Sequence, residues 1–548
     1  MKVFEHPAAI ALGAATLSLF YLVGPLVSPT HMQVYHLTGS ASAVFIPPVL
    51  YLCGLWLCLT LLLKLTAKYR QLQVSVWCCL LFLLPWVVTK NYAFLTGWDI
   101  PHWASVLILL LPSMTLLGAV FLCDRSFFDA FRPAQRFASQ MLGVLSLLGV
   151  AILCQLLWFD WDARSLNHPA ALHHELLSTH RPRGPRVIWI LLDELSYQQV
   201  YGQRFPGLRL PEFDRFANEA SVFTRTIPAG IYTEVAVPSL MTGLSLDDIR
   251  VSSNGMLMSM HDRDHHGWKP FDPAQTVFQD ALDNGYETGV AGWYNPYCRI
   301  LPSVLDRCYW ANRQRVNSEF NSGESLGGNL LSPLRDGLEY VRFCVRRMAD
   351  RSWDEDREYA TRNKERHIDE YRDLYEAADR LLASPSVDFV LLHMPVPHPP
   401  GIFDRHKMIF SVKHSSYLDN LVLADQYLAH IRSVLEQEGE WDSSAVIVMG
   451  DHSWRTKLLW SKQTGWTREE ELASNGTKFD DRPFYAVKLP GQHDGVRIDS
   501  PFPAANTRDL LDAIILNKIS ASEDLQKWVS SHSNRSDLAT FDYVRAQR

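Results

Sequence analysis

Hydrophobic residues dominate the chain before about residue 160, and a mixed polar and apolar pattern follows after about residue 180. Five apolar segments reach the ~20 residues that a membrane-spanning helix requires, near 8–28, 41–63, 74–95, 103–123 and 141–159. Buried core helices and, for the first segment, a signal peptide are the alternatives. Because five such segments follow one another and no clear cleavage site precedes His31, we expect a five-span transmembrane anchor over residues 1–160.

Basic residues are unevenly distributed over the loops between these segments. Two loops are basic and the alternate loops carry only Lys90; the basic positions are Lys64, Lys68, Arg70, Arg125, Arg132 and Arg136. Since Lys and Arg are enriched in cytoplasmic loops, we expect a cytoplasmic amino terminus. An odd number of spans then places everything after residue 160 on the periplasmic or extracellular side, as in a protein of a bacterial inner membrane.

The chain after the anchor alternates strand-like and helix-like segments. A polar linker over 161–185 leads into continuous apolar runs at 186–194, 288–293, 387–394, 444–450 and 484–489. Helical patterns cover 271–286, 420–439 and the highly charged stretch 335–383. Apolar runs of this kind are typical of strands that are covered on both faces. The pattern therefore predicts an α/β/α sandwich with a mainly parallel central sheet over 186–548.

Charge and cysteine content add less to this picture. The net charge of −7 averages two dissimilar parts of the chain, so it indicates no particular partner, and we expect no nucleic-acid ligand. Cys298 and Cys308 are close in sequence and fit a disulfide in an oxidising compartment, with two free thiols as the alternative. The sequence does not determine the oligomeric state.

Residues that suit metal binding or acid–base chemistry follow three of the predicted strands. Asp193 and Glu194 end the first run, His393 and His398 lie at the end of the third, and Asp451 and His452 follow the fourth. Ligands of open α/β sheets bind at the carboxyl ends of the strands, so these side chains are expected to meet. Carboxylates and imidazoles are ligands of Zn²⁺ and Mn²⁺.

The stretch 233–243, TEVAVPSLMTG, supplies a hydroxyl at a predicted helix start, with Pro238 near the first turn. The amino end of a helix favours an anion, and a bound cation is needed to activate a threonine hydroxyl. A simple N-cap is the alternative for Thr233, whereas Ser239 and Thr242 fit structural roles.

In this order, the motifs resemble the alkaline phosphatase and sulfatase superfamily, and more narrowly the membrane phosphoethanolamine transferases and lipoteichoic acid synthases. The resemblance implies that Thr233 is the nucleophile that becomes phosphorylated and also a metal ligand. It places four further metal ligands, at Asp193, Glu194, Asp451 and His452 in VIVMGDHSW. The segment LLHMPVPHPP resembles a substrate-side His-x4-His, which makes His393 a substrate-binding residue and His398 a catalytic or substrate-binding one.

The chain departs from the family pattern at three points. Ser453 replaces the usual glycine after Asp-His, and no histidine follows His452 until His493. Arg455 and Arg482 are therefore the candidates for binding the anionic group. The sulfatase signature Cys-x-Pro-Ser-Arg is also absent, which argues against formylglycine chemistry.

The sequence thus predicts a metal-dependent transferase or hydrolase of phosphate or sulfate esters, acting on envelope lipid or glycan through Thr233. A hydrolase with water as acceptor is the second interpretation. A non-catalytic protein that binds an envelope polymer and scaffolds its assembly is the third.

Overall fold

The computed structural model describes residues 5–27, 32–69, short pieces between 72 and 95, 125–164, 184–253, 255–313, 320, 324–335, 338, 355–456, 459–462, 465–476 and 478–533. The chain divides into two compact units. The first comprises residues 1–167, 253–255 and 315–339, and the second comprises the remainder. Each unit is described by itself.

The first unit is built from apolar helices that pack on one another. They are α1 (Pro7–Val23), α2 (Met32–Tyr35), α3 (Ala41–Thr66) and α6 (Arg125–Arg164), with a short 3-10 turn η1 (Pro25–Val27) after α1. Leu22 of α1, Phe45 of α3 and Phe159 of α6 share one core. The amide of Asn329 donates to the carbonyl of Ala43, which ties a segment from far along the chain to this unit.

Two helices among the described residues are long and apolar enough to cross a membrane, Ala41–Thr66 and Gln135–Arg164. They coincide with the second and fifth predicted spans. Helix α1 covers the first predicted span with only 17 residues. The predicted span 103–123 and most of 74–95 lie outside the described residues, so the count of five stays a prediction.

The second unit contains the predicted sandwich. Its eight-stranded sheet has the order β14-β2-β13-β12-β1-β9-β7-β8. The strands are β1 (Val187–Leu192), β2 (Ser221–Phe223), β7 (Glu287–Trp293), β8 (Arg307–Ala311), β9 (Val387–Met394), β12 (Ala445–Met449), β13 (Tyr485–Lys488) and β14 (Val496–Ile498). Neighbours from β12 to β8 run parallel, which confirms the mainly parallel sheet. The last predicted strand, β13, runs antiparallel to β12 instead.

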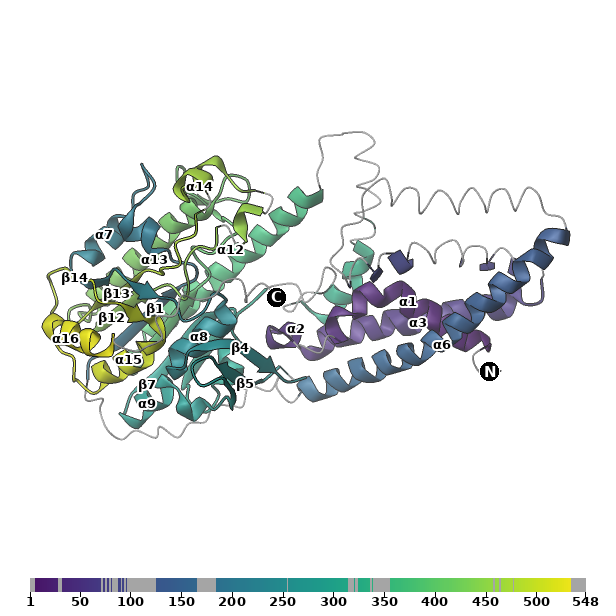
Figure 1. Cartoon of the computed structure of the whole chain (residues 1–548), viewed down its shortest axis with the longest axis horizontal. Coiled ribbons are helices and arrows are strands. Elements are labelled where there is room, and N and C mark those ends of the chain that lie inside the picture. Colours follow the sequence, from purple (N-terminus) through teal and green to yellow (C-terminus); the bar gives the residue numbers. More distant parts are fainter. Residues whose placement is uncertain are drawn as a thin grey trace. The chain divides into compact units, whose positions relative to one another are not determined.

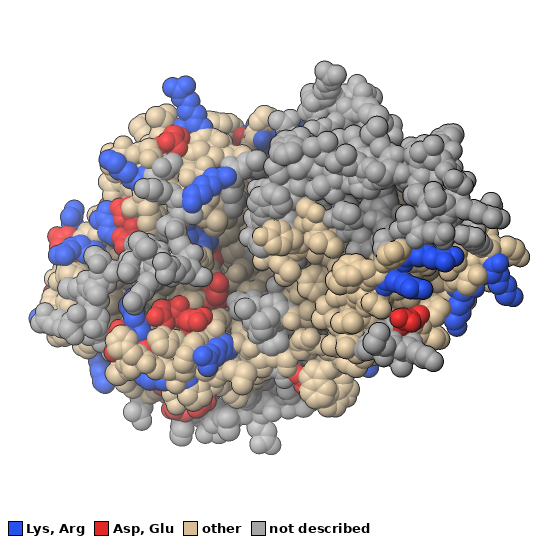
Figure 2. Space-filling view, turned by 45° about the vertical axis from the view of Figure 1, so that its right-hand side comes forward, with Lys and Arg blue, Asp and Glu red and all other residues tan. Residues whose placement is uncertain are grey.

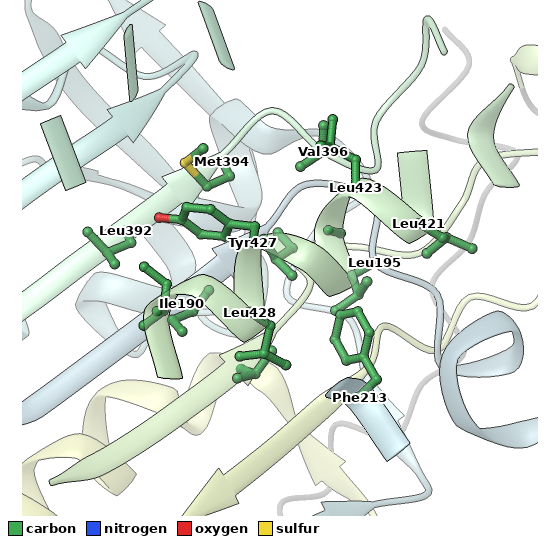
Figure 3. Packing of buried hydrophobic residues seen from close by; sticks show 14 of the residues in the cluster. Ile190, Leu195, Phe213, Leu392, Met394, Val396, Leu421, Leu423, Tyr427 and Leu428 are labelled. Atoms are coloured by element: carbon green, nitrogen blue, oxygen red, sulfur yellow. The ribbon is translucent and has the colours of Figure 1, made fainter. Parts of the chain in front are cut away.

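Helices cover both faces of this sheet (Figure 1). One face carries α7 (Pro211–Ala217), α12 (Glu355–Leu382) and α13 (Tyr417–Gln437), and the other carries α8 (Thr233–Thr242), α9 (Val277–Asp283) and α15 (Thr507–Ile515). Figure 3 shows Tyr427 and Leu428 of α13 beside Ile190 of β1 and Leu392 of β9. The predicted helix 335–383 is described only from Glu355 onward within this layer.

Smaller elements complete the unit. Three-residue 3-10 turns lie at Pro273–Gln275, Trp460–Lys462 and Ala504–Asn506, a π-helical turn at Gln198–Gly202, and short helices at Tyr297–Ile300 (α10), Arg468–Ala473 (α14) and Ser522–His532 (α16). Three small sheets pair β4 (Leu246–Val251), β5 (Leu257–Asp262) and β6 (Gly267–Pro270), β10 (Phe403–Asp404) with β11 (Ile409–Phe410), and β15 (Phe502–Pro503) with β3 (Thr226–Ile227). On the face drawn in Figure 2, basic and acidic side chains are interspersed over the described surface.

Candidate active site

Asp193 and Glu194 directly follow β1, and they point in different directions. Successive residues of an extended strand alternate between its two sides, and Glu194 then turns the chain with a positive φ of 63°. The Asp193 carboxylate accepts a hydrogen bond from the Thr233 hydroxyl at 2.9 Å. The Glu194 carboxylate instead pairs with Arg455 and accepts the indole N–H of Trp460 at 2.7 Å. In this arrangement the Glu194 carboxylate faces Arg455 and Trp460, and its predicted role as a metal ligand stays a prediction.

Helix α8 presents Thr233 at its first residue. The residue is 4% exposed and its hydroxyl makes no capping hydrogen bond, because Tyr232 occupies the N-cap position. The hydroxyl lies 3.4 Å from Nε2 of His452 in addition to its bond with Asp193. The simple N-cap alternative is thereby wrong. Pro238 was expected near the first turn and lies inside the helix, where Ser239 and Thr242 donate to backbone carbonyls.

Asp451 uses its two oxygens differently. Oδ1 accepts the backbone N–H groups of Glu194 at 3.1 Å and of His452 at 2.8 Å, which closes the turn after β12. Oδ2 lies 3.2 Å from Nε2 of His452. Nδ1 of His452 lies 3.2 Å from the Ser453 carbonyl, an acceptor, so Nδ1 carries the proton and Nε2 keeps a free lone pair.

His393 belongs to the same group, although the sequence suggested a substrate-side role for it. It is the seventh residue of β9 and fully buried, and its Nε2 lies 3.6 Å from Oδ2 of Asp193. Its Nδ1 lies 2.7 Å from the hydroxyl of Tyr297. Register explains the placement, because His393 is paired with Leu191 of β1, two residues before Asp193.

Asp193, His393 and Asp451 each offer one ligand atom, and these atoms lie within 4.8 Å of one another. Each of the three residues also has one buried polar atom without a hydrogen-bond partner among the described residues: Oδ1 of Asp193, Nε2 of His393 and Oδ2 of Asp451. Buried polar atoms are normally paired, so three unpaired ligand atoms in one place fit a divalent cation. Oxygen and imidazole donors suit Zn²⁺ or Mn²⁺.

The electrostatics of the group support this assignment. Burial, together with the charge of Asp451, raises the pKa of Asp193, and burial likewise raises the pKa of Asp451. Burial lowers the pKa of His393 to about 4 and holds that of His452 well below its usual value. The imidazoles are therefore neutral. The charge of Arg455 lowers the pKa of Asp193, but this guanidinium is paired with Glu194, so the two buried carboxylates call for a further positive charge. A bound cation would supply it.

Arg455 connects the Glu194 carboxylate to His398. One Nη donates to the carbonyl of Ile231 at 3.2 Å and the other lies 3.2 Å from Nε2 of His398. Because a guanidinium can only donate, Nε2 of His398 is the acceptor and its proton resides on Nδ1. Burial and the charge of Arg455 also lower the pKa of His398. His398 is thus neutral, with Nε2 occupied by Arg455 and Nδ1 without a hydrogen-bond partner among the described residues, and its catalytic role stays a prediction.

Arg482 is not brought into this group by the contacts that the structure gives. Its guanidinium forms an ion pair with Asp480, donates to the Thr224 carbonyl at 3.2 Å and lies over the ring of Tyr197. It lines a separate open cavity of about 510 Å³ with Gln198. Its substrate-binding role stays a prediction.

Sequence reasoning did not identify Asn295, Tyr297 and Trp460. Asn295 donates from its amide to the carbonyl of Thr233 at 3.2 Å, and Tyr297 contacts His393. All three lie in loops or short turns, outside any motif that marks chemistry. The disulfide Cys298–Cys308, which the sequence left open, is present beside Tyr297.

The mainly parallel sheet covered by helices on both faces, with metal-competent residues at the carboxyl ends of its strands, is an alkaline phosphatase-like fold. The family model for sulfatases matches residues 185–472, just over half of the 548 residues, so the chain belongs to the sulfatase family. Enzymes of this superfamily hydrolyse or transfer phosphate or sulfate esters and use divalent metals.

Several solved structures resemble the chain at low sequence identity. A lipoteichoic acid synthase from Listeria monocytogenes is 13% identical, with 61% of this chain and 72% of that chain covered and a TM-score of 0.35. A phosphonate monoester hydrolase of Agrobacterium radiobacter is 14% identical, with 60% and 73% covered and a TM-score of 0.35. A protein in the alkaline phosphatase superfamily from Vibrio parahaemolyticus is 16% identical, with 67% and 79% covered and a TM-score of 0.32. No curated protein is significantly similar to the chain in sequence.

Proposed function

We propose that this chain is a membrane-anchored, metal-dependent transferase or hydrolase of phosphate or sulfate esters on envelope lipid or glycan, with Thr233 as the nucleophile. One observation carries the proposal. The Thr233 hydroxyl lies at the first residue of a helix and bonds to Asp193. Asp193, His393 and Asp451 each have one buried polar atom without a hydrogen-bond partner among the described residues.

Thr233, the candidate cation ligands and helix α8 have separate roles in the proposed attack on the ester. The Thr233 hydroxyl donates to Asp193, so an acceptor is in place for the proton that leaves as the oxygen attacks phosphorus or sulfur. A divalent cation held by Asp193, His393, Asp451 and His452 would stabilise the alkoxide and the charge that develops on the ester oxygens. The amino end of α8 adds its partial positive charge beside the attacked group.

The reaction has two balanced steps. In the first, the bond from the attacked atom to Thr233 forms and the bond to the leaving alcohol breaks, and the alcohol leaves with a proton. In the second, a sugar hydroxyl, a lipid hydroxyl or water attacks the threonine ester and regenerates the Thr233 hydroxyl. The Nε2 lone pair of His398 is occupied by Arg455, so His398 would help to bind the substrate or accept the proton of the second nucleophile only after that contact opens.

Location is part of the same proposal. The two long apolar helices support membrane anchoring, and a disulfide in the second unit favours an oxidising compartment. We infer the five-span anchor over 1–160, the linker 161–185, a cytoplasmic amino terminus and a catalytic domain over 186–548 outside the bacterial inner membrane. A site close to the head groups favours a lipid-borne donor.

Replacing Thr233 with alanine tests the nucleophile. We expect Thr233→Ala to lower kcat by at least about 10³-fold, because covalent catalysis loses its attacking atom. The measurement is turnover of p-nitrophenyl phosphate, bis(p-nitrophenyl) phosphate and p-nitrophenyl sulfate with Mn²⁺ or Zn²⁺, together with the intact mass of the trapped protein. Addition of a sugar acceptor to a phospholipid donor then separates transfer from hydrolysis.

Thr242→Ala is the matched control. Thr242 ends the same helix and is also buried. Its hydroxyl donates to the carbonyl of Pro238 at 2.7 Å and accepts the backbone N–H of Leu244 at 3.4 Å. Its loss should leave kcat unchanged. Wild-type turnover by Thr233→Ala would remove the covalent mechanism. Complementation by this variant without any turnover would favour a polymer-binding scaffold.

A further inference from the structure

The segment between β7 and β8 contains a buried tyrosine that the reaction above does not use. Tyr297 begins α10 and is fully buried, and its hydroxyl lies 2.7 Å from Nδ1 of His393. The opposite ring atom of His393, Nε2, faces Asp193 and has no hydrogen-bond partner among the described residues. Tyr297 therefore contacts the one histidine nitrogen that points away from the candidate cation site.

A neutral imidazole carries its proton on one nitrogen only. If the proton is on Nε2, that atom can donate to Asp193, and it has no lone pair for a cation. If the proton is on Nδ1, the Tyr297 oxygen accepts it and Nε2 is free to bind a cation. His452 reaches the same state through the carbonyl of Ser453, which can only accept.

Three features hold the Tyr297 ring in place. A Cβ added at Gly292, the residue of β7 paired with His393, would lie 2.3 Å from the ring atom Cε2, so the ring fills the space that a side chain would need. The disulfide Cys298–Cys308 ties the residue after Tyr297 to β8. Asn295, two residues before, bonds to the carbonyl of Thr233 at 3.2 Å. One short segment thus contacts both the nucleophile and His393.

We infer that Tyr297 is a positioning residue that holds the orientation of His393 and accepts the Nδ1–H of the tautomer whose Nε2 binds the cation. The inference rests on the proposed function only in taking His393 as a cation ligand, and it does not depend on Thr233 as the nucleophile. Tyr297 touches neither substrate nor the attacked atom in this role.

A double-mutant cycle on cation affinity tests the inference without turnover. The full chain, purified in detergent and freed of metal with a chelator, is titrated with Mn²⁺ and with Zn²⁺ in a calorimeter. Tyr297→Phe should weaken affinity by about 10- to 100-fold, the usual effect of losing the hydrogen-bond partner of a ligating histidine. His393→Ala should also weaken it, and the double variant should match His393→Ala, because Tyr297 acts only through His393.

Tyr286→Phe is the matched control. Tyr286 is 1% exposed, lies just before the amino end of β7, and donates to the carbonyl of Pro185 at 3.1 Å. The Tyr286→Phe variant should bind cations with wild-type affinity. In chelator, Tyr286→Phe and Tyr297→Phe should have similar melting temperatures. Gly292→Ala displaces the ring while keeping the hydroxyl, and it should weaken affinity as well.

Two results would overturn the inference. Wild-type affinity in Tyr297→Phe shows that the hydroxyl does not prepare His393. An equal further loss when Tyr297→Phe is added to His393→Ala shows that the effect does not pass through the histidine. Either result leaves the Thr233 turnover test untouched, so the two proposals fail independently.

Discussion

At the scale of single residues, Asp451 supports both the backbone turn and the candidate cation site. Oδ1 accepts two backbone N–H groups, and Oδ2 is a buried atom without a hydrogen-bond partner among the described residues. The first contact needs only an acceptor, whereas cation binding needs the charge. An asparagine at this position keeps the former and removes the latter.

We expect Asp451→Asn to lower the affinity for Mn²⁺ by more than about 100-fold, since a charged ligand is lost. In chelator the variant should melt at or above the wild-type temperature at pH 8. The reason is that burial raises the pKa of Asp451, so its charged form is unfavourable without a cation. Calorimetric titration and thermal melting measure the two effects. Asp451→Ala loses the acceptor too and should melt lower, and a stable alanine variant contradicts this account.

Asp425 gives a prediction on pH away from the site. It accepts the backbone N–H of Phe213 at 2.8 Å, and burial raises its pKa to about 7. An acid whose pKa is raised by folding contributes most below its unfolded value near 3.9, and this contribution is lost as the pH rises to about 7.

Asp425→Asn keeps the acceptor and removes the titration. The melting temperature of the variant relative to wild type should therefore increase between about pH 4 and about 7 and stay constant above. Melting curves of both proteins across this range measure the difference. A difference that does not vary with pH would show that Asp425 is ionised in the folded chain throughout.

At the scale of elements, the carboxyl ends of β1, β9 and β12 bring together residues that are far apart in the sequence. Their parallel register places Asp193, His393 and Asp451 at one edge, and α8 adds Thr233 from above that edge. The segment after β7 then supports the group through Asn295 and Tyr297. A disulfide closes this segment against the start of β8.

Removing the disulfide should therefore affect stability and cation binding together. We expect the paired change Cys298→Ser and Cys308→Ser to lower the free energy of unfolding by about 3 kcal/mol, the loop-entropy value for a short closed loop. It should also weaken Mn²⁺ affinity, because the backbone beside Tyr297 is released. Urea unfolding and calorimetry measure both quantities. Dithiothreitol should lower both the free energy of unfolding and the Mn²⁺ affinity of the wild type, and it should leave both quantities unchanged in the serine variant. If dithiothreitol lowers them equally in the two proteins, the effect comes from other thiols.

At the scale of the whole molecule, the chain combines an apolar helical unit with a sulfatase-family unit. The helical unit includes two helices that are long enough to cross a membrane. Its outer surface is apolar too, with exposed side chains such as Leu61 of α3 and Leu147 of α6. The described residues among 315–339 group with this unit rather than with the sheet.

Thiol labelling in intact cells tests which side of the membrane carries the second unit. Protein quenched in acid and denatured should gain two more maleimide–polyethylene glycol labels with reductant than without, because Cys298 and Cys308 are oxidised outside the cytoplasm. The Cys298→Ser, Cys308→Ser variant should show no such difference. If the wild type carries two more labels than this variant when no reductant is added, both cysteines are free thiols. The second unit would then lie in the reducing cytoplasm.

By itself, the sequence determined the features that depend on local pattern. Apolar runs identified β1, β7, β9, β12 and β13, helical spacing identified α9 and α13, and strand-end motifs identified Asp193, Asp451 and His452 as neighbours in space. The sequence also proposed Thr233 as the nucleophile, because it lies at a predicted helix start within a motif that resembles the family pattern. These inferences succeed because burial on both faces and helix boundaries leave their signature within a few residues.

The tertiary structure alone decided which side chains face one another. Asp193 and Glu194 are adjacent in sequence, yet one faces the Thr233 hydroxyl and the other Arg455, because a strand alternates its sides and Glu194 turns the chain. His393 joins the candidate cation ligands through the register of β9 on β1, and Tyr297 reaches it from a loop. Strand register and loop paths are set by contacts between distant segments, and a single sequence carries no local sign of them.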